Sequence, residues 1–240
     1  MCNDDMRCTA CGAAVGQEDR FCRICGLPVR GGARVHEHRF VTALFSDLTQ
    51  YTLLSSLLDP EELKTVMEEI FLEAVRIVTS YGGEVEKFLG DAVVALFGVH
   101  RIHEDDLIRA VRSATAIHGF VEDLGRRLSL GDAAGLSMHT GIHAGAALVD
   151  DAPEVPLYQS VIGMPVIIAQ RLSALAAPGE ILIGGASRRE VERFFHLDSL
   201  GERRLKGLMD PLPVYRVGSA RRTPLGVRRP WRGYAPMVGR

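Results

Sequence analysis

The sequence is poor in lysine and has no cysteine beyond residue 25. Lys64, Lys87 and Lys206 are the only lysines among 28 basic residues, so arginine supplies nearly all of the positive charge. A net charge of −2 excludes the overall basic excess of a nucleic-acid binder. The 47% of hydrophobic and 24% of charged residues exclude a disordered or collagen-like chain and allow a substantial core.

Long apolar runs are also missing. The stretch at residues 133–149 has no charged side chain, but it contains His139, Thr140, His143 and several glycines. A membrane-spanning helix needs ~20 predominantly apolar residues. The N-terminus is polar and lacks the apolar region of an export signal. We therefore predict a cytoplasmic protein without a membrane partner.

The length of 240 residues exceeds the ~100 to 200 residues of a typical domain, which allows one full domain and a smaller appendage. We expect a small cysteine-rich module at residues 1–30, a linker at 31–38 and an α/β domain at 39–218. Residues 219–240 hold six arginines, three prolines and no acidic residue, which predicts a basic linker or tail. The rest of the chain carries a net negative charge, so we do not expect nucleic acid as a partner.

The cysteines form two matching pairs near the N-terminus. Cys8 and Cys11 precede Gly12, and Cys22 and Cys25 precede Gly26. Two intervening residues let both thiolates of a pair meet one ion, and the glycine permits the tight turn that follows. This pattern resembles a zinc ribbon with a structural Zn²⁺. Two disulfides or idle thiols are the alternative, and we interpret Cys2 as an unpaired thiol.

Local signals predict the first half of the large domain. An apolar run at 40–45 predicts a buried strand that ends at Ser46-Asp47, and Asp59-Pro60 predicts the start of a long helix. Gly82-Gly83 ends that helix. The runs at 84–89 and 92–97, joined only by Gly90-Asp91, predict a hairpin, and 105–128 is predicted to be a helix.

The second half alternates in the same way. We predict a glycine-interrupted hairpin at 136–149, and then a strand at 157–162, a helix at 164–175, a strand at 181–183, a helix at 188–195 and a strand pair at 203–217. Strands that alternate with helices of this length predict an α/β (α+β) fold, in which helices pack on a sheet.

Two carboxylates at strand ends carry the chemistry. Asp47 follows the first strand and Asp91 lies in the hairpin turn. Each alone is typical of a turn former. If the two strands are neighbours, the carboxylates converge as oxygen ligands of Mg²⁺ must.

Seven separated motifs resemble those of the class III nucleotidyl cyclase catalytic domain, in the family's order. They include Phe45-Ser-Asp47-Leu-Thr-Gln-Tyr51-Thr52 and Lys87-Phe-Leu-Gly90-Asp91, and the others lie at 141–145, 160–163, 169–172, 178–181 and 205–207. The resemblance covers about residues 39–218. It implies the family's ferredoxin-like sheet with helices packed on it.

The resemblance also implies the reaction. The 3′-hydroxyl of a nucleoside triphosphate attacks its own α-phosphorus, which gives a 3′,5′-cyclic nucleotide and pyrophosphate. Asp47 and Asp91 would hold two Mg²⁺ or Mn²⁺ ions per active site, and each active site would form between two subunits of a homodimer. The phosphates would be bound by the backbone amides of Leu48, Thr49, Gln50, Tyr51 and Thr52.

Substrate choice follows from the same resemblance. Adenylate-specific members pair a lysine with Asp or Thr at the positions of Lys87 and Ser160, whereas guanylate-specific members use Glu and Cys. The Ser160 hydroxyl can accept a hydrogen bond as Thr would, which favours ATP. Arg171 matches the arginine that stabilises charge at the α-phosphate, and Lys206 matches the lysine that contacts the terminal phosphates. We expect an adenylate cyclase.

Two positions depart from the family pattern. Ile167 stands where the family has Asn, and loss of one transition-state donor costs ~100- to 1000-fold in rate. Gln50 replaces a glycine of the phosphate loop. These departures leave open an alternative, a degenerate cyclase-homology module that binds nucleotide or dimerises to regulate an attached domain.

The last residues, from Tyr234 on, resemble the beginning of the ATPase domain that follows cyclase domains of this type.

Overall fold

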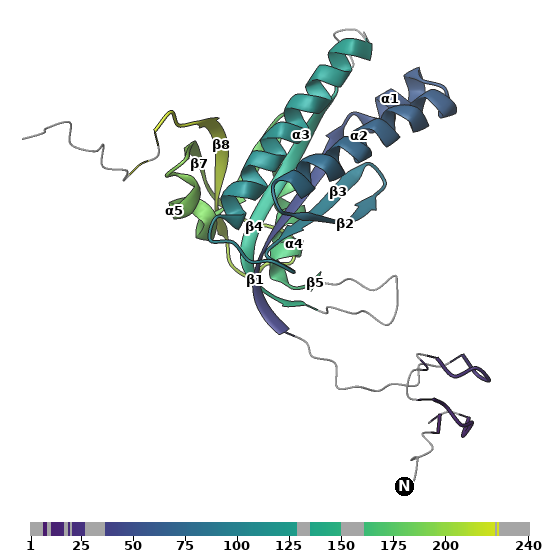
Figure 1. Ribbon diagram of the computed structural model, residues 1–240. Coiled ribbons are helices and arrows are strands. Elements are labelled where there is room, and N and C mark those ends of the chain that lie inside the picture. The colour runs from purple at the N-terminus through teal and green to yellow at the C-terminus, as the bar shows by residue number, and fades with distance from the viewer. Residues whose placement is uncertain are drawn as a thin grey trace, which may run out of the picture.

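The computed structural model describes residues 7–8, 11–16, 19, 21–26, 37–128, 135–149, 161–223 and 225. One mixed sheet dominates this part of the chain (Figure 1). Its strand order is β2-β3-β1-β4-β6-β8-β7, and the short β5 pairs with β4. The strands are β1 (Glu37–Thr49), β2 (Glu84–Leu89), β3 (Ala92–Phe97), β4 (Ser137–Val149), β5 (Val161–Ile162), β6 (Ile181–Gly184), β7 (Phe195–Arg203) and β8 (Leu212–Ala220).

Helices cover both faces of this sheet. The long α2 (Pro60–Ser80) and α3 (Asp106–Leu128) lie side by side on one face, and α4 (Met164–Leu175) packs on the other (Figure 1). The central strand β1 serves both layers: Leu44 and Leu48 join the core under α2 and α3, whereas Val41 and Phe45 join the core under α4. The predicted α/β fold with helices packed on a sheet is confirmed.

Several predicted elements are present with the predicted chemistry. Asp59 accepts hydrogen bonds from the amides of Glu61 and Glu62 at the start of α2, and the Glu62 side chain accepts one from the Asp59 amide. Tyr81 caps the helix end ahead of Gly82. The β2–β3 hairpin turns at Gly90, whose φ of 65° lies in the left-handed region that glycine tolerates best. The helices α3 and α4 also match their predictions.

The predicted glycine-interrupted hairpin at 136–149 is wrong, because β4 is a single strand of 13 residues. Its glycine at 141 serves close packing rather than a turn. A Cβ atom on Gly141 would lie 2.0 Å from the carbonyl oxygen of Ala169 and 2.3 Å from the amide nitrogen of Ser173, both in α4. Only glycine allows α4 to lie this close to β4.

Other boundaries differ as well. The strand β1 does not end at Ser46-Asp47 but continues to Thr49, because its pairing with β4 extends to Ser137. A short helix, α1 (Tyr51–Leu57), follows it and was not predicted. Of the strand predicted at 157–162, residues 161 and 162 form β5, and residues 157–160 lie outside the described residues.

Near the C-terminal edge, the predicted helix at 188–195 is shorter than expected, and the predicted strand pair at 203–217 is displaced. A 3₁₀ turn (Gly185–Ser187) leads into α5 (Arg188–Val191), and β7 already begins at Phe195. Pairing of β7 with β8 from Phe195 to Arg203 outweighs the local helical pattern. Within the described residues, no helix is both long and apolar enough to cross a membrane.

Candidate active site

Asp47 and Asp91 converge at one end of β1 and β3. These strands are antiparallel neighbours in which Ser46 pairs with Val93, so Asp47 lies beside the turn that carries Asp91. Burial raises the pKa of Asp47, and the negative charge of Asp91 raises it further, while the nearby His139 lowers it. The two carboxylates therefore repel each other in a partly desolvated place. Such a pair of oxygen donors fits a divalent cation, whose charge would remove the repulsion.

His139 of β4 faces Asp47 directly across the strand pair. Its Nε2 lies 3.9 Å from Oδ2 of Asp47, and its Nδ1 lies 2.8 Å from the carbonyl oxygen of Ser173 in α4. This place of His139 could not be predicted from the sequence, because it depends on the register of β1 with β4.

A second polar group lies on the opposite face of the same strands. The hydroxyls of Ser46 and Thr140 are 2.6 Å apart, and Nε2 of His118 in α3 lies 2.7 Å from the Thr140 hydroxyl. All three side chains are buried. Burial lowers the pKa of His118 to about 4, so the ring is neutral at pH 7. These hydrogen bonds hold α3 against β4 and β1 immediately beside Asp47.

Lys87 lies half-buried in β2, in the pairing with Val94 of β3. It lines a small pocket together with Val161, the first residue of β5, and with Val166 of α4. Ser160 lies outside the described residues. Val161, which follows Ser160 in the sequence, is the described residue that lies near Lys87.

The five residues expected to bind phosphates do not form a separate loop. Leu48 and Thr49 are the last residues of β1, and Tyr51 and Thr52 are the first of α1. Gln50 alone connects the two elements, with φ 66° and ψ 25°. It is the one non-glycine residue with positive φ among the described residues. This conformation favours glycine, which is the residue that the resemblance led us to expect here.

Arg171 and Ile167 lie one turn apart on α4. The Nε atom of Arg171 is buried and has no hydrogen-bond partner among the described residues, whereas Ile167 is 45% exposed. Lys206 is exposed in the connection between β7 and β8. In the described part of this single chain, no hydrogen bond or ion pair joins Arg171 or Lys206 to Asp47 or Asp91.

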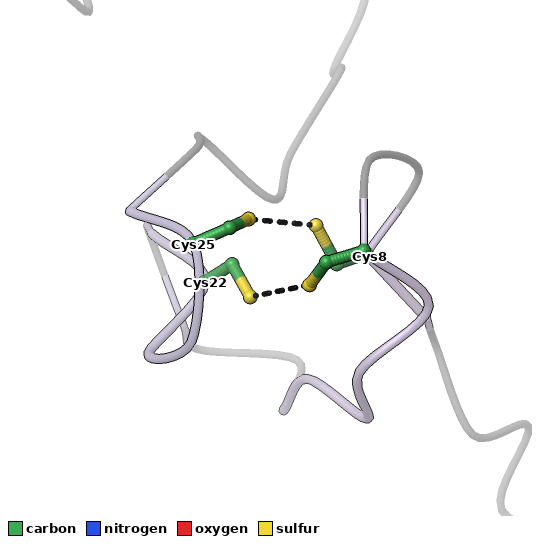
Figure 2. Close-up of side chains that lie close together, drawn as sticks. Cys8, Cys22 and Cys25 are labelled. Carbon is green, nitrogen blue, oxygen red and sulfur yellow. Dashed lines mark hydrogen bonds between the residues drawn. The ribbon is translucent and has the colours of Figure 1, made fainter.

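The four cysteines of the two pairs gather in one cluster, with all sulfur atoms within 4.8 Å of one another (Figure 2). Cys8 and Cys25 Sγ are 3.5 Å apart, and Cys11 and Cys22 Sγ are 3.4 Å apart. A disulfide needs about 2.05 Å, so neither of these two sulfur contacts is a disulfide.

The backbone around the cysteines repeats in the two pairs. The amide of Gly12 donates to the Cys8 carbonyl, that of Gly26 donates to the Cys22 carbonyl, and both glycines have positive φ. Backbone hydrogen bonds from Cys25 and Ile24 lower the pKa of the Cys22 thiol to about 6. The donor set fits a tetrahedral zinc ion with Zn–S bonds of about 2.3 Å. Cys2 lies outside the described residues.

A family model described as the adenylate and guanylate cyclase catalytic domain matches residues 33–218. An uncharacterized protein of Rhizobium meliloti is 31% identical over 193 residues, which cover 80% of this chain but only 18% of that protein. The chain spans less than half the length of other curated relatives it matches, too.

Two solved structures share the fold. The adenylyl cyclase CyaB from P. aeruginosa is 27% identical, with a TM-score of 0.73 over 78% of this chain and 98% of that one. The guanylyl cyclase Cya2 is 25% identical, with a TM-score of 0.70 over 78% of this chain and 95% of that one.

Proposed function

Because this chain belongs to the class III adenylate and guanylate cyclase catalytic domain family, we propose that it is an adenylate cyclase that converts ATP to 3′,5′-cyclic AMP and pyrophosphate. The observation that carries this proposal is the convergence of Asp47 and Asp91 at the ends of neighbouring strands. Two half-buried carboxylates that repel each other become more stable when a cation or a proton compensates their charge. The site is therefore suited to metal-assisted phosphoryl chemistry.

Asp47 and Asp91 would hold two Mg²⁺ or Mn²⁺ ions. When bound, such ions make the 3′-oxygen a better nucleophile and neutralise charge on the triphosphate. The residues themselves need to stay ionised, and the His139 ring favours the ionised form of Asp47. The amide of Leu48 donates to Oδ1 of Asp47 and orients the carboxylate.

The choice of ATP rests on Lys87 and Ser160. The comparisons include an adenylyl and a guanylyl cyclase, so the fold alone does not select the base. The Lys87 ammonium can donate to adenine N1, and the Ser160 hydroxyl can accept from the exocyclic amine. The pocket that Lys87 shares with Val161, the residue after Ser160 in the sequence, supports this pairing.

The remaining groups would act across a homodimer interface. Arg171 and Lys206 of one subunit would contact the triphosphate held by Asp47, Asp91 and the backbone of 48–52 of the other. The face around α4 supports this proposal because it exposes a set of apolar side chains, as expected of a surface that another chain covers. They are Ile162, Met164, Ile167 and Leu175.

The test compares cyclic AMP formation from Mn²⁺-ATP by the wild type with that of Asp47→Ala and Asp91→Ala. We expect each variant to lose at least ~1000-fold in rate, because each removes a metal carboxylate. Asp123→Ala is the matched control, since Asp123 is exposed on α3 and pairs with Arg126. Equal product from the wild type and both active-site variants would remove the basis of the proposal.

A second candidate function is a degenerate cyclase module that binds nucleotide and regulates an attached domain. Ile167 favours it, because its side chain offers no hydrogen bond where the family has Asn. The strained backbone of Gln50 at the phosphate position favours it as well. Nucleotide binding by the wild type without any metal-dependent turnover would select this function.

We also propose that residues 1–30 form a zinc ribbon, that 31–38 link it to the catalytic domain at 39–218, and that 219–240 lead into an ATPase domain. The cysteine cluster supports the first part. Residues 226–240 lie outside the described part of the chain. X-ray absorption at the zinc edge tests the ribbon: four sulfur ligands are expected, and Cys22→Ser should lower the sulfur count.

A further inference from the structure

The His139 ring is held in one orientation by α4. Its Nδ1 lies 2.8 Å from the carbonyl oxygen of Ser173 and 3.2 Å from the Ser173 hydroxyl, which itself donates to the His139 carbonyl oxygen at 3.1 Å. A carbonyl oxygen only accepts hydrogen bonds, so Nδ1 carries a proton. The ring therefore turns its other nitrogen, Nε2, toward Asp47.

The gap between His139 and Asp47 has a defined size. At 3.9 Å, Nε2 and Oδ2 are too far apart for a direct hydrogen bond, and both atoms accept hydrogen bonds, so one water molecule that donates to both can bridge them. The His139 side chain is 20% exposed and that of Asp47 is 33% exposed, so water can reach both.

The backbone at Asp47 and His139 is held in place by hydrogen bonds on the opposite face of the sheet. Ser46 and Thr140, the residues next to Asp47 and His139, are joined to each other and to His118 by buried hydrogen bonds. The pairing of β1 with β4 continues past this point to Thr49 and Ser137. A change at His139 is therefore expected to move the Asp47 side chain rather than the strands.

His139 also connects two parts of the proposed catalytic machinery. Ser173 lies two residues after Arg171 on α4, and His139 lies between Ser173 and Asp47. The helix that carries the arginine and the strand that carries the metal carboxylate are thus linked by one side chain.

We propose that His139 is a positioning residue for the metal site, which orients the Asp47 carboxylate through Nε2 and ties it to α4 through Nδ1. This inference rests on the proposed function, because it takes Asp47 as a metal ligand. Groups that orient a metal-binding side chain from outside typically contribute 10- to 100-fold to metal affinity or activity.

The test is binding of Mn²⁺ to the purified full chain without nucleotide, measured as loss of the free Mn²⁺ signal in electron paramagnetic resonance. We expect His139→Ala to weaken binding about tenfold or more. His139→Asn keeps a donor for Ser173 but lacks the group facing Asp47, and should be equally weak. His139→Gln keeps a polar group that reaches Asp47, and should recover most of the affinity.

Two controls make the outcomes distinct. His143→Asn makes the same exchange four residues along β4, next to Gly184, and should bind Mn²⁺ like the wild type. Asp47→Ala should lose binding. If all His139 variants bind like the wild type while Asp47→Ala does not, this inference is overturned and the proposed function stands. If Asp47→Ala binds like the wild type, the metal site and this inference both fall.

Kinetic measurements on the His139 variants separate a positioning role from a purely structural one. A positioning residue should change the turnover number and the concentration of free Mn²⁺ needed for half-maximal rate, and leave KM for ATP nearly unchanged. An unchanged metal requirement with a lower thermal stability would show that His139 only supports the fold, and would overturn the inference.

Discussion

Asp47 and Asp91 lie close enough for the charge of Asp91 to raise the pKa of Asp47, which burial already raises. Such a pair lowers the stability of the folded chain unless a cation or a proton compensates its charge. The metal site of the proposed cyclase depends on that pair and on the residues around it.

Gln50→Gly should stabilise the protein by about 1 kcal/mol, because Gln50 holds a left-handed backbone that costs a non-glycine residue about this much. Chemical denaturation measures the free energy of unfolding. Gln170→Gly is the matched control: it makes the same exchange inside α4 and should destabilise by about 1 kcal/mol. A loss of stability in Gln50→Gly would mean that the side chain makes a contact that outweighs the strain.

Ile167→Asn should raise the turnover number about tenfold, because it restores a hydrogen-bonding group one turn before Arg171. Initial rates with saturating Mn²⁺-ATP measure the effect. Leu72→Asn removes another exposed aliphatic side chain, on the outer side of α2, and should leave the rate unchanged. An unchanged or lower rate in Ile167→Asn would show that this position does not face the reacting phosphate.

The three lysines should differ in their tolerance of arginine. Lys87→Arg and Lys206→Arg should each lower kcat/KM for ATP about tenfold, because a planar guanidinium does not replace a compact ammonium at a fitted site. Lys64→Arg should have no effect, since Lys64 is exposed on α2 and only approaches Glu68 at 3.7 Å. Equal effects at all three positions would contradict the assigned roles.

Stability should fall below about pH 6.5 partly because of His118. Burial lowers its pKa to about 4, so the unfolded chain binds a proton between about pH 6.5 and 4 while the folded chain does not. At pH 5 this costs about 2 kcal/mol relative to pH 7. His118→Gln should therefore lose about 2 kcal/mol less than the wild type over this range. Parallel pH profiles of the two proteins would refute the assignment.

Local signals predicted the elements that local chemistry determines. The capping residues Asp59 and Glu62 and the turn at Gly90 are readable in the sequence because each acts within a few residues. Gly141 was misread as a turn signal because its purpose is contact with α4, which depends on tertiary packing.

The candidate site shows the same division. The convergence of Asp47 and Asp91 could be predicted on the condition that their strands are neighbours, and they are. His139 could not be found in this way. Its place opposite Asp47 follows from a strand register that extends from Glu37 to Thr49, and its orientation follows from Ser173, 34 residues further along the chain.

The most direct measurement supplies the purified chain with Mn²⁺ and, in parallel reactions, with ATP or GTP, and identifies the products by mass spectrometry. The account predicts cyclic AMP from ATP, formed at least about tenfold faster than cyclic GMP from GTP, and no cyclic AMP from Asp47→Ala. If neither cyclic nucleotide forms above the level of Asp47→Ala, or if cyclic GMP forms faster than cyclic AMP, the result would contradict it.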